Sequence, residues 1–228
     1  MNQHDFLFSH IELRTERCDS LSMRRLLAGG GYGLHQAIWR LLPCDPEARR
    51  DFLYHRIDGA GVKFYVVSAR ELVDDTGLWR IRSKPYAPQI EAGESLNFTL
   101  RANPTVARGR EPGGKGKSIR HDVVMDARRS FPEASEAERV AQAGMHWLHG
   151  REGQRAERHG YVIESAHADG YTQHRLHKPG TERAITFSTL DYVGRLRVTD
   201  PERFRSALFG GIGHARGFGC GLLLVRRV

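Results

Sequence analysis

The chain has 228 residues, enough for one large domain or for two domains that each bury a core. Hydrophobic residues make up 39% and charged residues 27%, which is typical of a globular protein and excludes a disordered chain. The net charge of +8 favours a polyanionic partner. Most of the basic residues are arginines, whose planar guanidinium suits phosphates and guanine edges.

The three cysteines, Cys18, Cys44 and Cys220, are odd in number, scattered and without a CxxC pair. They therefore predict neither a disulfide framework nor a zinc site, and they fit a reducing cytoplasm. The N-terminus lacks a basic region followed by a long apolar run, and no stretch approaches the roughly 18 apolar residues of a transmembrane helix, so we expect neither secretion nor a membrane span.

The first part of the chain alternates between strand and helix patterns. The predicted elements are a strand over 5–13, a polar connection with a helical turn, a helix over 31–42, a short turn from Pro46 capped by Asp45, a hairpin of strands 52–57 and 62–70 around a DGAG turn, and a strand over 77–83. A segment rich in proline and glycine, 84–94, then reads as a linker.

The pattern restarts after this linker. The predicted elements are a strand over 95–104, a flexible basic loop over 106–121, a helix over 135–149 with a capping box at Ser135 and Glu138, strands over 161–168, 170–178 and 183–198, a helix over 200–209 and a closing strand over 221–228. This order predicts an α+β fold of two tandem ferredoxin-like, or RRM-like, βαββαβ domains, residues 1–92 and 93–228.

The helix over 31–42 carries a candidate catalytic pair. Leu34, Ile38, Leu41 and Leu42 have the spacing of one buried helical stripe, and a run of glycines leads into the helix. His35 falls in or next to the first turn, with Tyr32 three residues earlier. The positive end of the helix dipole disfavours imidazolium there, which helps to keep a neutral base near pH 7. A half-buried histidine bonded to a backbone carbonyl is the structural alternative.

A second candidate lies between the last helix and the last strand, where residues 210–221 contain six glycines. A helix-to-strand connection needs one or two, so six favour a backbone that approaches phosphates closely. No GK[ST] follows, and the segment precedes a strand, so it is neither a Walker A loop nor a dinucleotide-binding fingerprint. We expect nucleic-acid binding at Gly211, Gly213, His214, Arg216, Gly217 and Gly219.

Basic residues are concentrated between positions 101 and 129, where eight Lys or Arg face three acidic residues. The predicted phosphate-contacting patch consists of Arg101, Lys115, Lys117, Arg120, Arg128 and Arg129, and a solvated surface loop is the alternative. His146 and His149 have helical spacing, but no carboxylate or cysteine at suitable spacing completes a metal site. We expect neither a metal nor a cofactor.

Three separated motifs carry a family resemblance: GLHQAIWRLLP near the N-terminus, FTLRANP at the start of the second half, and GIGHARGFGCGLL before the last strand. In this order the chain resembles, over most of its length, the CasE-type endoribonucleases of type I-E CRISPR Cascade, in the repeat-associated mysterious protein superfamily.

The resemblance implies a metal-independent ribonuclease that cleaves precursor CRISPR RNA at the base of each repeat hairpin and stays bound to its product with the other Cascade subunits. It places the family's catalytic histidine and tyrosine at His35 and Tyr32, and its glycine-rich loop at Gly211 to Gly221. Arg216 stands where the family more usually has a lysine.

The chemistry of RNA agrees with this expectation, because the ribose 2′-OH is itself a nucleophile, so cleavage requires in-line positioning and the movement of two protons. We predict that His35 is general base or acid, that Tyr32 orients the scissile phosphate or shares proton transfer, and that a nearby cation steadies the developing charge. A non-catalytic RNA-binding subunit with RRM-like folds is the alternative, although no strand matches the aromatic RNP1 pattern.

Overall fold

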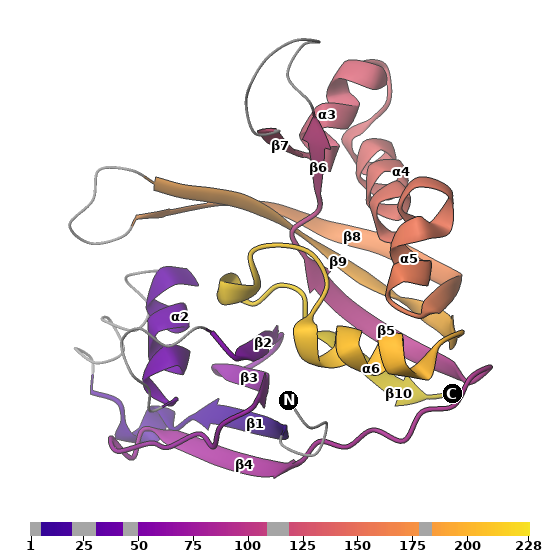
Figure 1. Cartoon of the computed structure of the whole chain (residues 1–228). Coiled ribbons are helices and arrows are strands. Elements are labelled where there is room, and N and C mark those ends of the chain that lie inside the picture. Colours follow the sequence, from indigo (N-terminus) through magenta and orange to yellow (C-terminus); the bar gives the residue numbers. More distant parts are fainter. Residues whose placement is uncertain (1–5, 20–30, 43–49, 109–118, 178–183) are drawn as a thin grey trace.

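The computed structural model describes residues 6–19, 31–42, 50–108, 119–177 and 184–228. Its strands form two four-stranded antiparallel sheets, with a two-stranded ribbon beside the second (Figure 1). The turn predicted at Pro46, Cys44, and the basic residues Lys115 and Lys117 lie outside the described residues.

The first sheet has the strand order β2-β3-β1-β4. Its strands are β1 (Leu7–Leu13), β2 (Phe52–Ile57), β3 (Lys63–Ser68) and β4 (Trp79–Pro85). The short helix η1 (Thr15–Arg17) and the helix α2 (Gly31–Arg40) lie between β1 and β2. The predicted stripe Leu34, Ile38, Leu41 and Leu42 is buried against Ile11, Phe64 and Val66 on one face of this sheet. The amphipathic pattern therefore fixes which side of α2 meets the sheet and leaves His35 on its flank.

The second sheet has the order β10-β5-β9-β8. Its strands are β5 (Ser95–Ala102), β8 (Tyr161–His177), β9 (Ala184–Val198) and β10 (Leu223–Arg227). The inward residues of β5 alternate as predicted, with Leu96, Phe98 and Leu100 in the core. If the strands of each sheet are numbered 1 to 4 along the chain, both sheets have the spatial order 4-1-3-2. This is the order of a ferredoxin-like domain, so the fold is a tandem pair of such domains.

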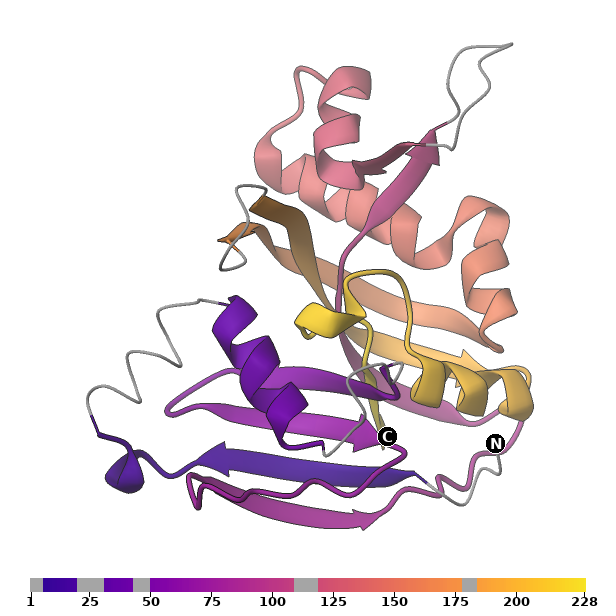
Figure 2. The ribbon, with the colours of Figure 1, turned by 60° about the vertical axis from the view of Figure 1, so that its left-hand side comes forward.

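Two helices cover one face of the second sheet (Figure 2). The helix α4 (Glu136–His149) begins at the predicted capping box, in which Ser135 and Glu138 each bond the other's backbone, and it ends at Gly150. The helix α6 (Pro201–Gly210) is capped by Asp200. Both helix predictions are confirmed.

Other parts of the second half differ from the sequence prediction. The basic segment is partly structured, because β6 (Thr105–Arg108) pairs with β7 (Ile119–Asp122) in a ribbon. The short helices α3 (Val123–Ser130), η2 (Arg151–Gly153) and α5 (Gln154–Arg158) were not predicted. The two strands predicted over 161–168 and 170–178 are one strand, β8, which continues through an irregularity between Asp169 and Thr172.

A small apolar cluster joins the two halves. Phe6, Leu53 and Val67 from the first half pack with Leu222 from the second, and the Phe6 ring stacks on Phe209 of α6 at 4.4 Å between centroids. The strands of the first sheet lie within residues 7–85, and those of the second lie within residues 95–227. The domain boundary between residues 92 and 93 stays a prediction. None of the helices in the described ranges is long and apolar enough to cross a bilayer.

Candidate active site

His35 is the fifth residue of α2, next to the first turn, where the sequence predicts it. Its ring lies among three aromatic side chains, at centroid distances of 6.2 Å to Tyr32, 6.0 Å to Trp39 and 5.2 Å to Phe218. Tyr32 and Trp39 come from α2 itself, whereas Phe218 belongs to the short helix η3 (Arg216–Phe218) near the end of the chain. The fold thus brings the predicted histidine to the glycine-rich segment, with the predicted tyrosine beside the histidine.

The surroundings of His35 favour a neutral imidazole. Burial lowers its pKa, the backbone of Gly217 opposes this effect, and the positive charge of Arg50 lowers the pKa further. The Nδ1 atom is buried beside Gly217 and has no hydrogen-bond partner among the described residues. The neutral state agrees with the sequence prediction, but its principal cause is burial, which the helix-dipole argument did not include.

The segment of residues 211–221 between α6 and β10, here called the glycine loop, is fixed by hydrogen bonds from several elements. Arg216 donates through Nε to the Gly213 carbonyl at 3.0 Å and through Nη1 to the Gly210 carbonyl at 2.5 Å. The Tyr54 hydroxyl on β2 donates to the Gly217 carbonyl at 3.0 Å. The loop is therefore attached to both halves of the chain.

Two glycines allow the loop to approach the first half closely. A Cβ on Gly217 would lie 3.0 Å from Arg50 Nη1 and 3.5 Å from His35 Cε1. A Cβ on Gly219, whose φ is +80°, would lie 3.0 Å from the Tyr54 ring. The glycine content therefore serves the approach of the loop to His35 and Tyr54, in addition to any contact with phosphate.

An open cleft of about 570 Å³ lies between α2 and the glycine loop. Its lining residues are His35, Trp39, Arg50, Gly213, His214, Ala215, Arg216, Gly217 and Phe218. A second depression, about 910 Å³, is lined by residues that include Arg120, Arg175 and His174. His214 and Ala215 line both, so the two depressions adjoin along the glycine loop.

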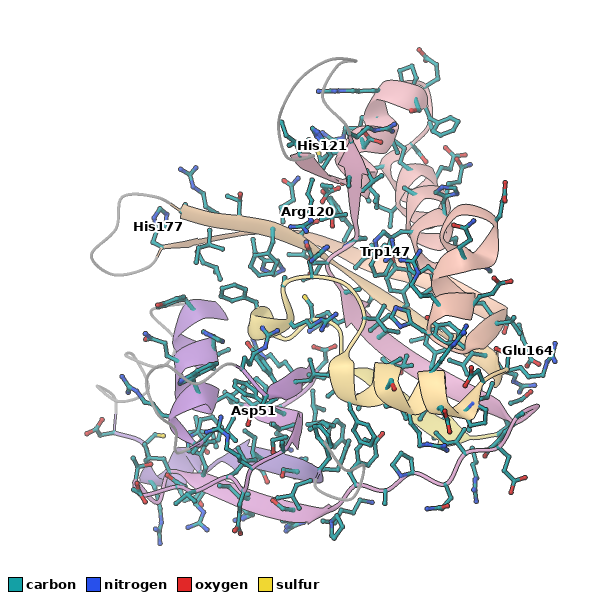
Figure 3. All side chains as sticks on the ribbon, viewed as in Figure 1. Asp51, Arg120, His121, Trp147, Glu164 and His177 are labelled. Atoms are coloured by element: carbon teal, nitrogen blue, oxygen red, sulfur yellow. The ribbon has the colours of Figure 1, made fainter. Side chains whose placement is uncertain are left out.

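Positive charge gathers around this loop. The pKa of His214 is lowered by burial and then by the positive charges of Arg120, Arg216 and Arg155. The Arg155 guanidinium lies 4.4 Å from the centre of the Trp147 ring on α4, in a cation–π contact. Figure 3 labels Arg120, on β7 of the two-stranded ribbon, and Trp147, on α4. The sequence prediction missed Arg155, because its helix was not recognised.

The remaining predicted basic residues have different surroundings. Arg101 forms a two-bond ion pair with Asp191, at 2.7 Å for each bond, and also contacts Asp58, so its charge is already compensated. Arg128 and Arg129 are exposed on α3. Of the predicted phosphate-contacting patch, Arg120 lines the second depression. The contact of each patch residue with RNA stays a prediction.

The predicted nearby cation has a candidate in Arg50, which the sequence analysis did not name. Arg50 lies in a stretch that was predicted only as a polar turn, and its place beside His35 depends on the tertiary fold. Among the described residues, no group of three or more His, Cys, Asp or Glu side chains is arranged to hold a metal ion.

Comparison with known proteins places this geometry in a family. A model of the CRISPR associated protein family matches residues 7–227. The CRISPR system Cascade subunit CasE of Escherichia coli K12 is 29% identical over 197 residues, covering 84% of this chain and 89% of that protein. The CRISPR-associated endoribonuclease Cse3 of Thermus thermophilus is 27% identical over 216 residues, covering 90% of this chain and 94% of that protein.

Solved structures share the fold. Thermus thermophilus Cse3 bound to an RNA representing a pre-cleavage complex has a TM-score of 0.68 at 22% identity, covering 97% of this chain and 99% of that chain. Escherichia coli Cas6e has a TM-score of 0.62 at 24% identity, covering 97% and 100%. Since the family model spans nearly the whole sequence, the chain belongs to the CRISPR-associated protein family that this model describes.

Proposed function

We propose that this protein is an endoribonuclease that cleaves precursor CRISPR RNA at the base of the repeat hairpin and keeps the product within a Cascade complex. Two relatives named as a Cascade subunit and as a CRISPR-associated endoribonuclease, each covering more than four fifths of the chain, support this function. The observation that carries it is the meeting of His35 and the glycine loop in one cleft that Arg50 and Arg216 also line, with the Tyr32 ring 6.2 Å from the His35 ring. We place its action in the cytoplasm, as the cysteine pattern predicts.

The reaction requires no nucleophile from the protein. The 2′-OH of the nucleotide at the cleavage site attacks the adjacent phosphorus and loses its proton to a base. The 5′-oxygen of the next nucleotide leaves with a proton from an acid, so the products are a 2′,3′-cyclic phosphate and a 5′-hydroxyl. Burial lowers the pKa of His35 and so favours the neutral imidazole that a base requires, and Tyr32 is near enough to share the proton transfer or orient the phosphate.

Binding of the hairpin uses the surface that continues from the cleft. The depression that contains Arg120 and Arg175 adjoins the cleft through His214 and Ala215, so a duplex held there would end near His35. An A-form stem presents a deep and narrow major groove, which favours recognition through phosphates and shape. Arginines that border this groove supply the charge, and the product stays bound because cleavage leaves the stem intact.

The test is cleavage of a labelled repeat hairpin with EDTA present. We expect the parent protein to give one product with a cyclic or 3′-phosphate end. His35→Ala should lower the single-turnover rate by on the order of 10²-fold to 10⁴-fold, because general acid–base assistance is lost, with hairpin affinity within about threefold.

His167→Ala, which removes an exposed histidine on β8, is the matched control and should cleave like the parent. Intact RNA that is bound tightly by the parent would support the non-catalytic RNA-binding subunit instead. Cleavage by His35→Ala within about threefold of the parent would contradict the role of this histidine.

A further inference from the structure

Arg50 and Arg216 both line the cleft beside His35, but their side chains have different surroundings. Arg216 donates to two carbonyls of its own segment, those of Gly213 and Gly210. Arg50 makes no hydrogen bond or ion pair within the described part of the chain. One guanidinium is therefore committed to the shape of the glycine loop, and the other has its donors available.

The neighbouring carboxylate does not compensate the charge of Arg50. Asp51 is bound to Arg70 through two bonds of 2.6 Å, and Figure 3 shows Asp51 near the strands of the first sheet. The charges of Arg50 and Arg216 instead repel each other, and Arg216 lowers the pKa of Arg50 after burial has done so. No carboxylate in the described part of the chain pairs with Arg50 or Arg216, and two neighbouring cations of this kind favour an anion.

The position of Arg50 suits an anion that reacts with His35. A Cβ atom built on Gly217 would lie 3.0 Å from Arg50 Nη1 and 3.5 Å from His35 Cε1, so both groups lie beside this glycine. The absence of a side chain at Gly217 therefore lets the guanidinium and the imidazole approach one point from the same side of the loop. A phosphate at the mouth of this cleft would meet both groups.

We propose that Arg50 is a catalytic residue, donating to a non-bridging oxygen of the scissile phosphate, and that Arg216 is a positioning residue that holds the glycine loop. This inference rests on the proposed ribonuclease function. When the 2′-oxygen attacks, the phosphorus becomes five-coordinate and its non-bridging oxygens gain negative charge. A guanidinium already in place stabilises that charge more than it stabilises the ground state, so it raises the rate of the chemical step.

The experiment compares Arg50→Gln with Arg216→Gln in single-turnover cleavage at saturating protein, together with hairpin affinity and melting temperature. Arg50→Gln should slow cleavage by on the order of 10²-fold to 10³-fold, with affinity within about threefold and an unchanged melting temperature. Arg50→Lys should recover part of the rate, because the charge is kept without the planar fork. Added guanidinium ion should also recover part of the rate of Arg50→Ala.

Arg216→Gln should instead lower the melting temperature and the affinity, because the carbonyls of Gly213 in the loop and of Gly210 at the end of α6 lose their donor. Arg82→Gln is the matched control, since it removes an exposed arginine on the edge strand β4, and it should cleave like the parent.

The two proposals fail in distinguishable ways. Suppose that the parent and Arg82→Gln cleave and that His35→Ala does not. If Arg50→Gln then cleaves within about threefold of the parent, the catalytic role of Arg50 is wrong, but the ribonuclease function stands. A loss of affinity in Arg50→Gln that accounts for the whole loss of cleavage would also overturn the catalytic role. If the parent itself leaves the hairpin intact, the proposed function fails.

Discussion

The imidazole of His35 combines burial with a neighbouring positive charge, and both disfavour its protonated form. A base is active when it is neutral, so a lowered pKa keeps the active form present at lower pH. The acid limb of the cleavage profile should therefore have its midpoint below the ordinary value of 6.5. Arg50→Gln removes one of the two lowering causes and should move this midpoint to higher pH.

Single-turnover rates measured across the pH range check this expectation. Circular dichroism at each pH is the control, because His55, His159 and His174 also have pKa values lowered by burial. The unfolded chain binds protons on these groups more readily, so the stability that their neutral forms contribute is present above pH 6.5 and is lost as the pH falls. A midpoint above 6.5 in the folded parent would contradict the buried neutral base.

Sequence reasoning could name Tyr32 and His35 as the candidate catalytic pair because they are three residues apart on one helix. It did not reach Arg50, which lies 15 positions after His35 and meets it only through the fold. Nor could it separate the roles of Arg216 and Arg50, since the hydrogen bonds of Arg216 depend on the local path of the glycine loop.

At the scale of elements, α4 shows that the ends of a helix can be predicted from local sequence signals. Its start is fixed by the reciprocal bonds of Ser135 and Glu138, and its end by Gly150, so both boundaries can be read from neighbouring residues. The β6–β7 ribbon lacks such local signals, because its strands are only four residues each and are separated along the chain by ten residues rich in glycine and charge. β8 was divided at Gly170 for a similar reason, since glycine marks both a turn and an irregularity within a strand.

Gly144 on α4 gives a test in which local propensity and packing predict opposite signs. Alanine at an exposed helical site would stabilise by up to about 1 kcal/mol. Here a Cβ would lie 2.5 Å from Leu190 Cδ2 and 2.9 Å from Ala168 Cβ, so Gly144→Ala must push the helix away from the sheet. We expect a loss of about 1–3 kcal/mol in the free energy of unfolding.

Urea unfolding followed by circular dichroism measures this change. Gln142→Ala, at an exposed position of the same helix, should change stability by no more than about 0.5 kcal/mol. A Gly144→Ala variant as stable as the parent would mean that α4 does not lie tightly against β9.

At the scale of the whole molecule, the cleft exists because two halves meet. The helix α2, which carries His35, belongs to the first half and the glycine loop to the second (Figure 2). The Phe6–Phe209 stack and the Tyr54 hydroxyl join the two halves. The order of the elements predicted the two ferredoxin-like units. Their relative placement depends on scattered apolar residues with no periodic pattern, so only the family resemblance indicated that His35 and the loop would be neighbours.

Phe209→Ala tests this dependence. Loss of the stack with Phe6 and of the edge contact with Tyr86 should destabilise the protein by less than the ~3–5 kcal/mol typical of a fully buried phenylalanine, because Phe209 is only partly buried. The single-turnover cleavage rate should fall more than hairpin affinity, since His35 and the glycine loop beside it come from opposite halves, while Arg120 and Arg175 of the second depression belong to the second half alone.

Urea unfolding and the hairpin assay, both under conditions where the variant is folded, measure the two effects. Phe131→Ala, which removes a ring that is 52% exposed at the end of α3, should leave both nearly unchanged. A Phe209→Ala variant that loses stability but cleaves at the parent rate would show that the stack does not set the geometry of the cleft.

The attachment of the glycine loop determines when its conformational entropy is lost. Five glycines would make a free segment very costly to order, yet the bonds from Arg216 and Tyr54 fix this one without RNA. That cost is incurred when the chain folds and does not recur when a hairpin arrives. Mutations that loosen the loop should consequently appear first as weaker binding by an otherwise folded protein.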